Sequence, residues 1–443
     1  MAEQMKSSGI DWIKDIPSSW EINKVKYLAT EPGTLFLDGD WIESDVIEES
    51  GIRYLTTGNV GAGFYKEQGS GYISEKTFSE LHCLNVYPGD LMISRLNEPI
   101  GRSCIIPDTE SRYVVAVDNV VLRPNANYNK KFIMYGMNAD GYAEHANMIA
   151  RGATMSRISR SQLGQFWLAF PNIEEQQAIA DFLDKECAQI DSIAADLEKQ
   201  IALLQQYKKS LITETVTKGL DKSVPMKDSG VEFFGKIPAH WKVSKTKYVA
   251  DISIGLVTTM TANYVDEDGV PLIRNSNIRT NHIDDNGMVY LSKEFAKANI
   301  GRALHKGDIV TVHTGDVGTS AIINETYHMS HGFATIISRL KTKTVNNQFL
   351  CWLYNSEIFK EMSIAYSTGD GRQNLNLYDF VDFYILIPTL KEQMEIVNWL
   401  NLKCTEIDNF IENKQQQLLL IQQHKKSLIY EYVTGKKRVK EVQ

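Results

Sequence analysis

The sequence lacks several features that would place it quickly in a class of protein. It has only five cysteines in 443 residues, none close to another, which argues against a zinc cluster or a disulfide framework: Cys83, Cys104, Cys187, Cys351 and Cys404. No apolar run approaches the roughly 20 residues of a membrane-spanning helix. The opening MAEQMKSSGIDW has neither the basic start nor the apolar stretch of a signal peptide. We therefore expect a cytoplasmic protein without membrane contact, whose cysteines are small buried side chains.

The sequence also lacks the marks of catalysis. No G-x-x-x-x-G-K-[ST] phosphate loop occurs, because Gly235-Lys236 is followed by Ile237 and Gly435-Lys436 by Lys437. The glycines of TTGNVGAGF do not fit G-x-G-x-x-G, and no Asn-Pro-Pro-aromatic set of an adenine methyltransferase occurs. PDTESR, at 107–112, is similar to part of a metal-dependent nuclease signature, but it ends in arginine instead of lysine and has no counterpart elsewhere. We interpret it as a turn and predict a non-catalytic chain.

A basic charge balance is missing as well. The formal charge is −8, whereas affinity for nucleic acid depends largely on phosphate neutralisation by Lys and Arg. The charge is uneven, however: residues 38–49 hold six acids and no basic residue, and residues 150–163 hold three arginines and no acid. Net charge therefore leaves DNA binding open, and the length indicates two or three domains.

What the sequence does contain is a duplication. FPNIEEQQAIADFLDKECAQID and IPTLKEQMEIVNWLNLKCTEID align without a gap, pairing Pro171 with Pro388 at an offset of 217 residues. At the same offset QQYKKSLITETVT meets QQHKKSLIYEYVT. Near the start SGIDWIKDIPSSW meets SGVEFFGKIPAHW at an offset of 221 residues. Between these stretches the halves agree only in outline, as short β-branched and aromatic runs such as YVVAVDNVVLR and FATIISRL. Each half is predicted to be a mostly β domain followed by a long helix.

The two long helices have start signals and a seam. Asn172 with Glu175, and Thr389 with Glu392, fit capping boxes. Apolar residues then recur at alternating spacings of three and four, as in a coiled coil: Ile190, Ala194, Leu197, Ile201, Leu204 and Leu211, then Ile407, Ile411, Leu418, Ile421 and Leu428. The first helix leads to the second domain and the other leads back, so the pair should be antiparallel.

Two lysines, Lys208 and Lys425, interrupt this seam. We interpret them as side chains whose stems lie along the seam while their ammonium groups reach solvent, with contact to a binding partner as the alternative.

With these features the chain resembles the specificity subunit of type I restriction-modification enzymes. The doubled EEQQAI and KEQMEI after proline, the doubled KKSLI, and the IPSSW and IPAHW openings carry the resemblance over essentially the whole chain. It implies an α+β fold with two mostly β target recognition domains, residues 1–170 and 222–388. Two long antiparallel coiled-coil helices, residues 171–221 and 389–443, would join them in a pseudo-two-fold circular arrangement.

The resemblance also implies a function. Each domain would read one half of a bipartite, asymmetric double-stranded DNA target, and the helices would set the gap and dock two methyltransferase subunits, with restriction subunits outside. S-adenosylmethionine would belong to the methyltransferase, and ATP and Mg to the restriction subunit, so this chain would hold no cofactor and no metal. Independently, two similar reading heads predict half-sites about one helical turn, or 34–36 Å, apart.

Candidate DNA-contacting residues lie in two pairs of polar loops. Base edges favour Arg, Asn and Gln, and phosphates favour Ser, Thr and backbone N–H groups. The loop before the first long helix offers Arg151, Thr154, Ser156, Arg157 and Arg160, and its counterpart offers Arg372, Gln373, Asn374 and Asn376. The loops after the repeated Gly-Asp turn offer Arg95, Asn97 and Arg102, then His313, Thr314 and Thr319.

Two other functions stay open at this point. The chain could be the specificity subunit of a related system, such as a methyltransferase without a translocating nuclease. The neighbouring genes would distinguish this function from that of a subunit of a full restriction-modification enzyme. It could instead be a nuclease or methyltransferase itself, which only the 107–112 loop supports.

Overall fold

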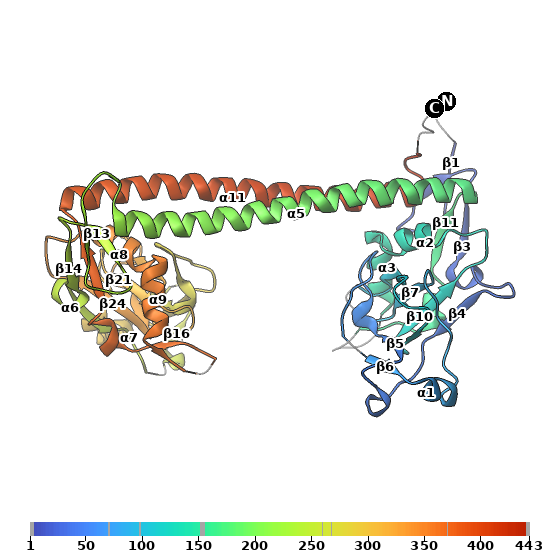
Figure 1. Cartoon of the computed structure of the whole chain (residues 1–443), viewed down its shortest axis with the longest axis horizontal. Helices are drawn as coiled ribbons and strands as arrows, with labels where there is room; N and C mark the ends of the chain where they lie inside the picture. Colours follow the sequence, from blue (N-terminus) through green and yellow to red (C-terminus); the bar gives the residue numbers. More distant parts are fainter. Residues whose placement is uncertain are drawn as a thin grey trace. The chain divides into compact units, whose positions relative to one another are not determined.

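Two compact units make up the protein. The computed structural model describes residues 4–69, 71–96, 99–150, 156–258, 260–266, 268–369 and 371–439 (Figure 1). Unit 1 comprises Met1–Leu197 with Gln416–Gln443, and unit 2 comprises Glu198–Gln415. Each unit therefore contains one β domain and one half of each of two long helices, α5 (Ile173–Lys218) and α11 (Leu390–Val433). The chain leaves unit 1 through α5 and returns through α11.

The β domain of unit 1 is built on two main sheets. Its strands are β1 (Met5–Ser7), β2 (Asp15–Pro17), β3 (Glu21–Lys24), β4 (Leu35–Asp38), β5 (Ile52–Leu55), β6 (Gly71–Ile73), β7 (Leu91–Ser94), β8 (Ser103–Ile105), β9 (Tyr113–Val115), β10 (Asn119–Arg123) and β11 (Trp167–Phe170). Its short helices are α1 (Glu75–Glu80), α2 (Lys130–Met137), α3 (Asp140–Ile149) and α4 (Arg160–Leu163). The sheets run β4-β10-β7-β8 and β6-β5-β9, with the pairs β11-β3 and β1-β2 beside the long helix.

Unit 2 repeats this order. Its strands are β12 (Met226–Asp228), β13 (Lys236–Pro238), β14 (Lys242–Lys245), β15 (Ala250–Ile254), β16 (Tyr264–Val265), β17 (Val270–Arg274), β18 (Ile278–Arg279), β19 (His282–Ile283), β20 (Val289–Leu291), β21 (Ile309–Val312), β22 (Ser320–Ile322), β23 (His331–Phe333), β24 (Thr335–Leu340), β25 (Ser367–Thr368), β26 (Asn374–Leu375) and β27 (Tyr384–Ile387). Its short helices are α6 (Thr246–Val249), α7 (Lys293–Ala298), α8 (Asn347–Tyr354), α9 (Glu357–Ala365) and α10 (Leu377–Phe380). The sheets β15-β24-β21-β22 and β16-β20-β17-β23 correspond to the two main sheets of unit 1, with β16 added.

The central strands are apolar on both faces, and each face has its own core. In β7 and β10, Leu91, Ile93 and Leu122 belong to the core beneath the long helix, whereas Met92 and Val121 belong to a second core on the other face. Successive side chains of a strand point to opposite faces, which explains this division. The continuous apolar runs in the sequence therefore mark strands that are covered on both sides.

The long helices pair antiparallel within each unit, which confirms the predicted fold class. In unit 1 the ring of Phe182 lies 4.6 Å from that of Tyr432. The capping signals are also confirmed: the Thr389 amide donates to the Glu392 carboxylate (3.0 Å), and the Glu392 amide donates to the Thr389 hydroxyl (3.3 Å). All five cysteines are buried, and burial raises the pKa of Cys187 and Cys404 to about 11.

The two lysines in the seam have a role that the sequence did not indicate. Lys208 pairs with Asp408 at 2.6 Å within unit 2, and Lys425 pairs with Asp191 at 2.6 Å within unit 1. The two ion pairs are the same interaction repeated at the offset of 217 residues. Each ammonium group therefore meets an exposed carboxylate of the facing helix, a contact that our interpretation from the sequence did not include. Such charge pairs favour one register of two paired helices.

A buried glutamine fastens each long helix to its domain. The Gln176 side chain accepts from the Asn129 amide (2.8 Å) and donates to the carbonyls of Asn127 (3.1 Å) and Pro171 (2.9 Å). Gln393 repeats all three bonds in unit 2, to Asn346, Thr344 and Pro388. The partners are backbone groups, so this clamp does not depend on the side chains of the variable domain.

Replacing Gln393 with alanine is expected to lower the free energy of unfolding of unit 2 by about 2–4 kcal/mol, because three backbone polar groups would lose their partner in the interior. Urea denaturation followed by circular dichroism measures this loss. The matched control is Gln416→Ala on the exposed side of the same helix. Equal effects of the two substitutions would contradict the clamp.

The end of each long helix is tied to the hairpin that opens a domain. Lys218 donates to the Phe234 carbonyl (3.1 Å) within unit 2, and Lys436 donates to the Ile13 carbonyl (2.9 Å) within unit 1. Burial lowers the pKa of both ammonium groups. In unit 1 this contact joins the segment after α11 to the first hairpin.

Candidate nucleic-acid interface

In unit 1 an arginine cluster is built where β7 ends. The backbone of Arg95 accepts from the Ile158 amide (3.1 Å), and its guanidinium donates to the Val117 carbonyl (2.6 Å). The same guanidinium lies 3.3 Å from the Asp38 carboxylate and 3.4 Å from that of Asp118. Arg95 is only 6 % exposed, so it holds three loops together from inside.

Two further arginines surround this centre on its outer side. Arg160 lies 3.4 Å from Asp38 and donates to the Phe36 carbonyl (3.2 Å), and Arg157 lies 3.9 Å from Asp118. The Arg157 side chain is 59 % exposed. With Arg95, three guanidinium groups share two carboxylates, which leaves a positive excess that phosphate or a base edge could use.

The corresponding place in unit 2 has amide and imidazole groups instead. His313 follows β21, and its Nδ1 lies 2.9 Å from Oδ1 of Asn374 and 3.0 Å from the Thr314 hydroxyl. The Gly315 amide donates to the Gln373 carbonyl (3.0 Å), so the two predicted loops of this half lie side by side. This loop of unit 2 carries one arginine, the exposed Arg372, where the corresponding place of unit 1 has Arg95, Arg157 and Arg160.

The structure sorts the predicted contact residues into three groups. Arg157, Arg372, Asn374 and Asn376 are exposed, and the half-buried members are Ser156, Arg160, His313, Thr314 and Gln373. The buried members are Arg95, Arg102 and Thr319. Asn97, Arg151 and Thr154 lie outside the described residues.

The buried members of the predicted set have hydrogen-bond partners within the domain. Arg102 donates to four carbonyls, among them those of Val60 (2.7 Å) and Leu96 (2.8 Å), and burial lowers its pKa. The Thr319 hydroxyl donates to the Asp316 carboxylate (2.6 Å). Because their donors are used inside the domain, we leave these residues and Arg95 out of the contact surface.

Sequence reasoning missed the residues that hold the site. Asp38 and Asp118 are distant in sequence from the arginines that they position, and no local pattern connects them. It also missed Tyr378, whose ring is 82 % exposed in α10 just after Asn376. The signal in the sequence is an aromatic residue close after the polar run from Arg372 to Asn376.

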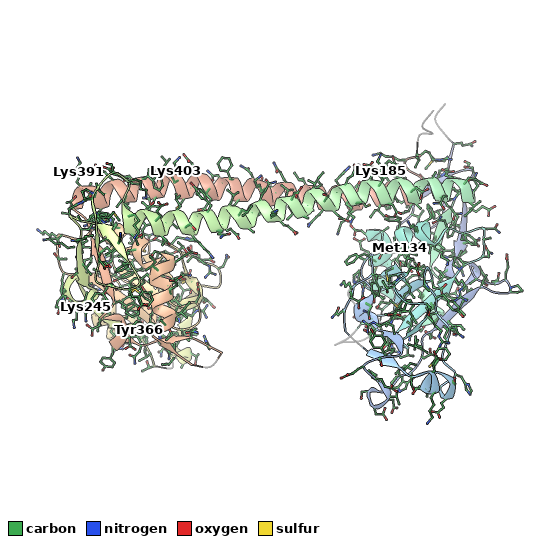
Figure 2. All side chains as sticks on the ribbon, in the orientation of Figure 1. Met134, Lys185, Lys245, Tyr366, Lys391 and Lys403 are labelled. Carbon is green, nitrogen blue, oxygen red and sulfur yellow. The ribbon has the colours of Figure 1, made fainter. Side chains whose placement is uncertain are left out.

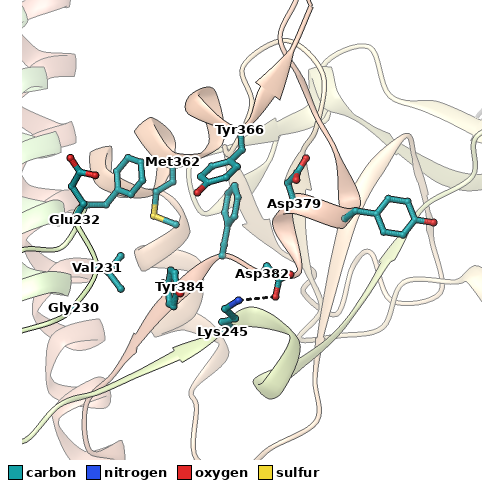
Figure 3. A pocket seen from close by; sticks show the side chains of 12 residues that line it. Gly230, Val231, Glu232, Lys245, Met362, Tyr366, Asp379, Asp382 and Tyr384 are labelled. Carbon is teal, nitrogen blue, oxygen red and sulfur yellow. Dashed lines mark hydrogen bonds and ion pairs between the residues drawn. The ribbon is translucent and has the colours of Figure 1, made fainter.

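A cavity of about 470 Å³ in unit 2 is lined by Lys245, Asp382 and Tyr384, among other residues (Figure 3). Lys245, on its wall, pairs with Asp382 at 3.1 Å, and Lys247 pairs with the same carboxylate at 2.6 Å. Within the described ranges, no group of three or more His, Cys, Asp or Glu could hold a metal ion. In that same part of the chain, no helix has the length and apolar character needed to cross a membrane.

Comparison with known proteins gives a consistent assignment. The family model described as type I restriction modification DNA specificity domain matches residues 20–203 and again 238–423. The chain is 26 % identical to the type I restriction enzyme EcoBI specificity subunit of Escherichia coli over 61 % of this chain and 58 % of that one. It is also 26 % identical to the putative MjaX specificity subunit of Methanocaldococcus jannaschii, over 84 % and 83 %. The chain thus spans less than two thirds of the length of the E. coli relative.

Solved structures show the same fold. A chain from a structure described as "Structural basis underlying complex assembly and conformational transition of the type I R-M system" matches with a TM-score of 0.73 at 12 % identity, covering 95 % of this chain and 99 % of that one. The HsdS subunit from Thermoanaerobacter tengcongensis matches with a TM-score of 0.54 at 12 % identity, covering 95 % and 98 %. The duplicated arrangement is therefore shared with these chains.

Proposed function

The chain belongs to the type I restriction modification DNA specificity family, and from this premise we propose that it is the DNA-recognition subunit of such a system. Each β domain reads one half of a bipartite, asymmetric DNA target. One observation carries the proposal: the same skeleton occurs twice, and equivalent loops carry different side chains, with arginines in unit 1 and His313 and Asn374 in unit 2. Two similar heads with different contact groups suit two different half-sites.

The chain's own share in this function is recognition. Methyl transfer, with S-adenosylmethionine, belongs to the methyltransferase partner, and ATP with Mg belongs to the restriction partner. The proposal is supported by polar loops that offer hydrogen-bond donors to a duplex. The long helices would connect the heads and set the gap between the half-sites.

A repeated face on the helices fits two copies of one partner. Leu203, Gln206 and Ser210 follow one another at spacings of three and four on α5, and all are exposed. Leu420, Gln423 and Ser427 repeat them on α11 at the offset of 217 residues, also exposed. We call these two sets the repeated helix face. Packing explains identical residues at buried positions but not at exposed ones, so three identical exposed side chains on both helices fit a surface that binds the same partner twice.

We therefore propose that each copy of this face binds one methyltransferase subunit. Other exposed positions of the helices carry charge, as Figure 2 shows for Lys185 on α5 and for Lys391 on α11, or apolar side chains that differ between the two helices, such as Ile193 and Phe410. Leu203 is 55 % exposed and Leu420 is 64 % exposed, so both offer apolar surface to a partner.

Native mass spectrometry of the chain with the methyltransferase encoded beside it is expected to find two methyltransferase copies. Leu203→Glu or Leu420→Glu should leave one copy and the double variant none, because a buried unpaired carboxylate opposes docking. Ala195→Glu is the control, because this exposed position of α5 is not repeated and α11 carries Glu412 at the same offset. Two copies retained by the double variant would overturn this docking surface, and no complex with the unaltered chain would overturn the proposed partner.

A further inference from the structure

One exposed position occupies the same place in the backbone of both domains but carries a different side chain in each. Arg157 pairs with Leu96 in an isolated antiparallel β-bridge, and Asn374 pairs with Thr314 in another. Leu96 and Thr314 each lie two residues after the end of the corresponding strands β7 and β21. The backbone therefore places Arg157 and Asn374 at the same point of the two domains.

The neighbouring bonds agree with this equivalence. After Arg157, the Ile158 amide donates to the Arg95 carbonyl (3.1 Å), and after Asn374, the Leu375 amide donates to the His313 carbonyl (2.7 Å). One residue further, a side chain begins a short helix in each domain. Ser159 accepts from the Gln162 amide (3.1 Å), and Asn376 accepts from the Tyr378 amide (3.0 Å). These bonds are made by backbone groups or by the helix-capping side chain. They therefore place the backbone of residues 157 and 374 independently of the side chain found there.

In each unit the side chain at this position contacts a group of its own domain and is otherwise exposed to solvent. Arg157 lies 3.9 Å from the Asp118 carboxylate, and its side chain is largely exposed. Asn374 is exposed, and His313 orients its amide through the 2.9 Å contact to Oδ1. The supporting groups, Arg95 and His313, also occupy equivalent places, directly after β7 and β21.

Arginine and asparagine are two side chains that commonly recognise base edges in the major groove. Arginine donates two bonds to O6 and N7 of guanine, and asparagine pairs with N6 and N7 of adenine. We propose that this shared position determines specificity in both domains, with Arg157 reading a guanine in one half-site and Asn374 reading an adenine in the other. The inference rests on the proposed function and assigns a base to one position in each domain.

The test exchanges the two side chains in the full complex. The chain is purified with its methyltransferase, and methylation rates with S-adenosylmethionine are measured on duplexes in which each base pair of both half-sites is varied in turn. Arg157→Asn should lower the preference for G·C by about 10- to 100-fold at one position of one half-site, and Asn374→Arg should do the same for A·T in the other. All other positions should keep their preference.

Two conservative variants separate base reading from other effects. Arg157→Lys keeps the charge and donors for O6 and N7 but loses the planar fork, so it should weaken the guanine preference less than Arg157→Asn does. Asn374→Asp keeps the size but offers only acceptors, so it should favour cytosine in place of adenine. Their thermal unfolding should match that of the unaltered chain, because the position is fixed by backbone bonds.

The outcomes are distinct. If Arg157→Asn and Arg157→Lys slow methylation equally on every duplex, or leave every preference unchanged, Arg157 reads no base and the inference is overturned. The same applies to Asn374 and its variants. If the unaltered complex shows no sequence preference at all, the proposed function itself fails.

Discussion

Replacing residues 222–388 with the corresponding region of a relative is expected to change one half of the DNA target and to leave the other half unchanged. These residues contain the whole β domain of unit 2 and none of α5 or α11. The graft should fold because the Gln393 clamp binds backbone groups of the domain. The half-site specificity should change completely, which makes this one of the two largest effects that we expect.

The measurement is the methylated sequence found in cells that carry the exchanged chain and the methyltransferase. The reciprocal exchange, of residues 1–170, is the control and should change only the other half-site. The apolar residues that the helices add to the core of unit 2, such as Ile212, Val216 and Leu400, should be matched in the chosen relative. A change in both half-sites after either exchange would contradict the division into two reading domains.

The second large effect concerns the gap between the half-sites. Inserting seven residues after Leu197 in α5 and seven after Lys414 in α11 is expected to lengthen the gap by about three base pairs. Seven helical residues add about 10 Å at 1.5 Å each, and a base pair occupies about 3.4 Å. A whole heptad keeps the apolar seam in phase. Both half-site sequences should remain as they were, as mapping of the methylated sequence would show.

Insertion into α5 alone is the matched control. The ion pairs Lys208–Asp408 in unit 2 and Lys425–Asp191 in unit 1 then cannot both form while the helices stay paired along their length. We expect the single insertion to reduce the stability of the chain and its methylation activity. A double insertion that alters the bases read, while the gap stays constant, would refute the role of the helices as a spacer.

The long helices were the most predictable part of the molecule, since their signals are local. The capping residues and the apolar seam lie within the helices themselves, and α11 begins one residue after its predicted cap, Thr389. The seam residues Ile190, Leu197, Ile407 and Leu428 are buried as expected. What the seam pattern could not provide was the partner of Lys208 and Lys425, because each aspartate lies on the other helix.

The candidate site was predictable as a set of loops and not as a set of side chains. Polar loops after β7 and β21 were expected, and the bridges from Leu96 to Arg157 and from Thr314 to Asn374 bring the two predicted loops of each half together. Which arginine turns inward depends on carboxylates far away in sequence. Arg95 meets Asp38 only because β4 and β7 flank the same central strand, β10.

The equivalence of Arg157 and Asn374 was also hidden in the sequence. The loops before them differ in length and composition, whereas the backbone pairing after β7 and β21 is the same. Sequence alignment compares side chains, and the two domains carry different side chains at this place. Alignment therefore does not reveal that the two positions are equivalent.

The most direct test of the central claim is to express the unaltered chain with the methyltransferase encoded beside it and to map methylated adenines across the host genome by single-molecule sequencing. We predict one split, asymmetric motif with a modified adenine in each half-site, on opposite strands, which depends on this chain. A continuous or palindromic motif, or methylation that is unchanged when the chain is absent, would contradict the account.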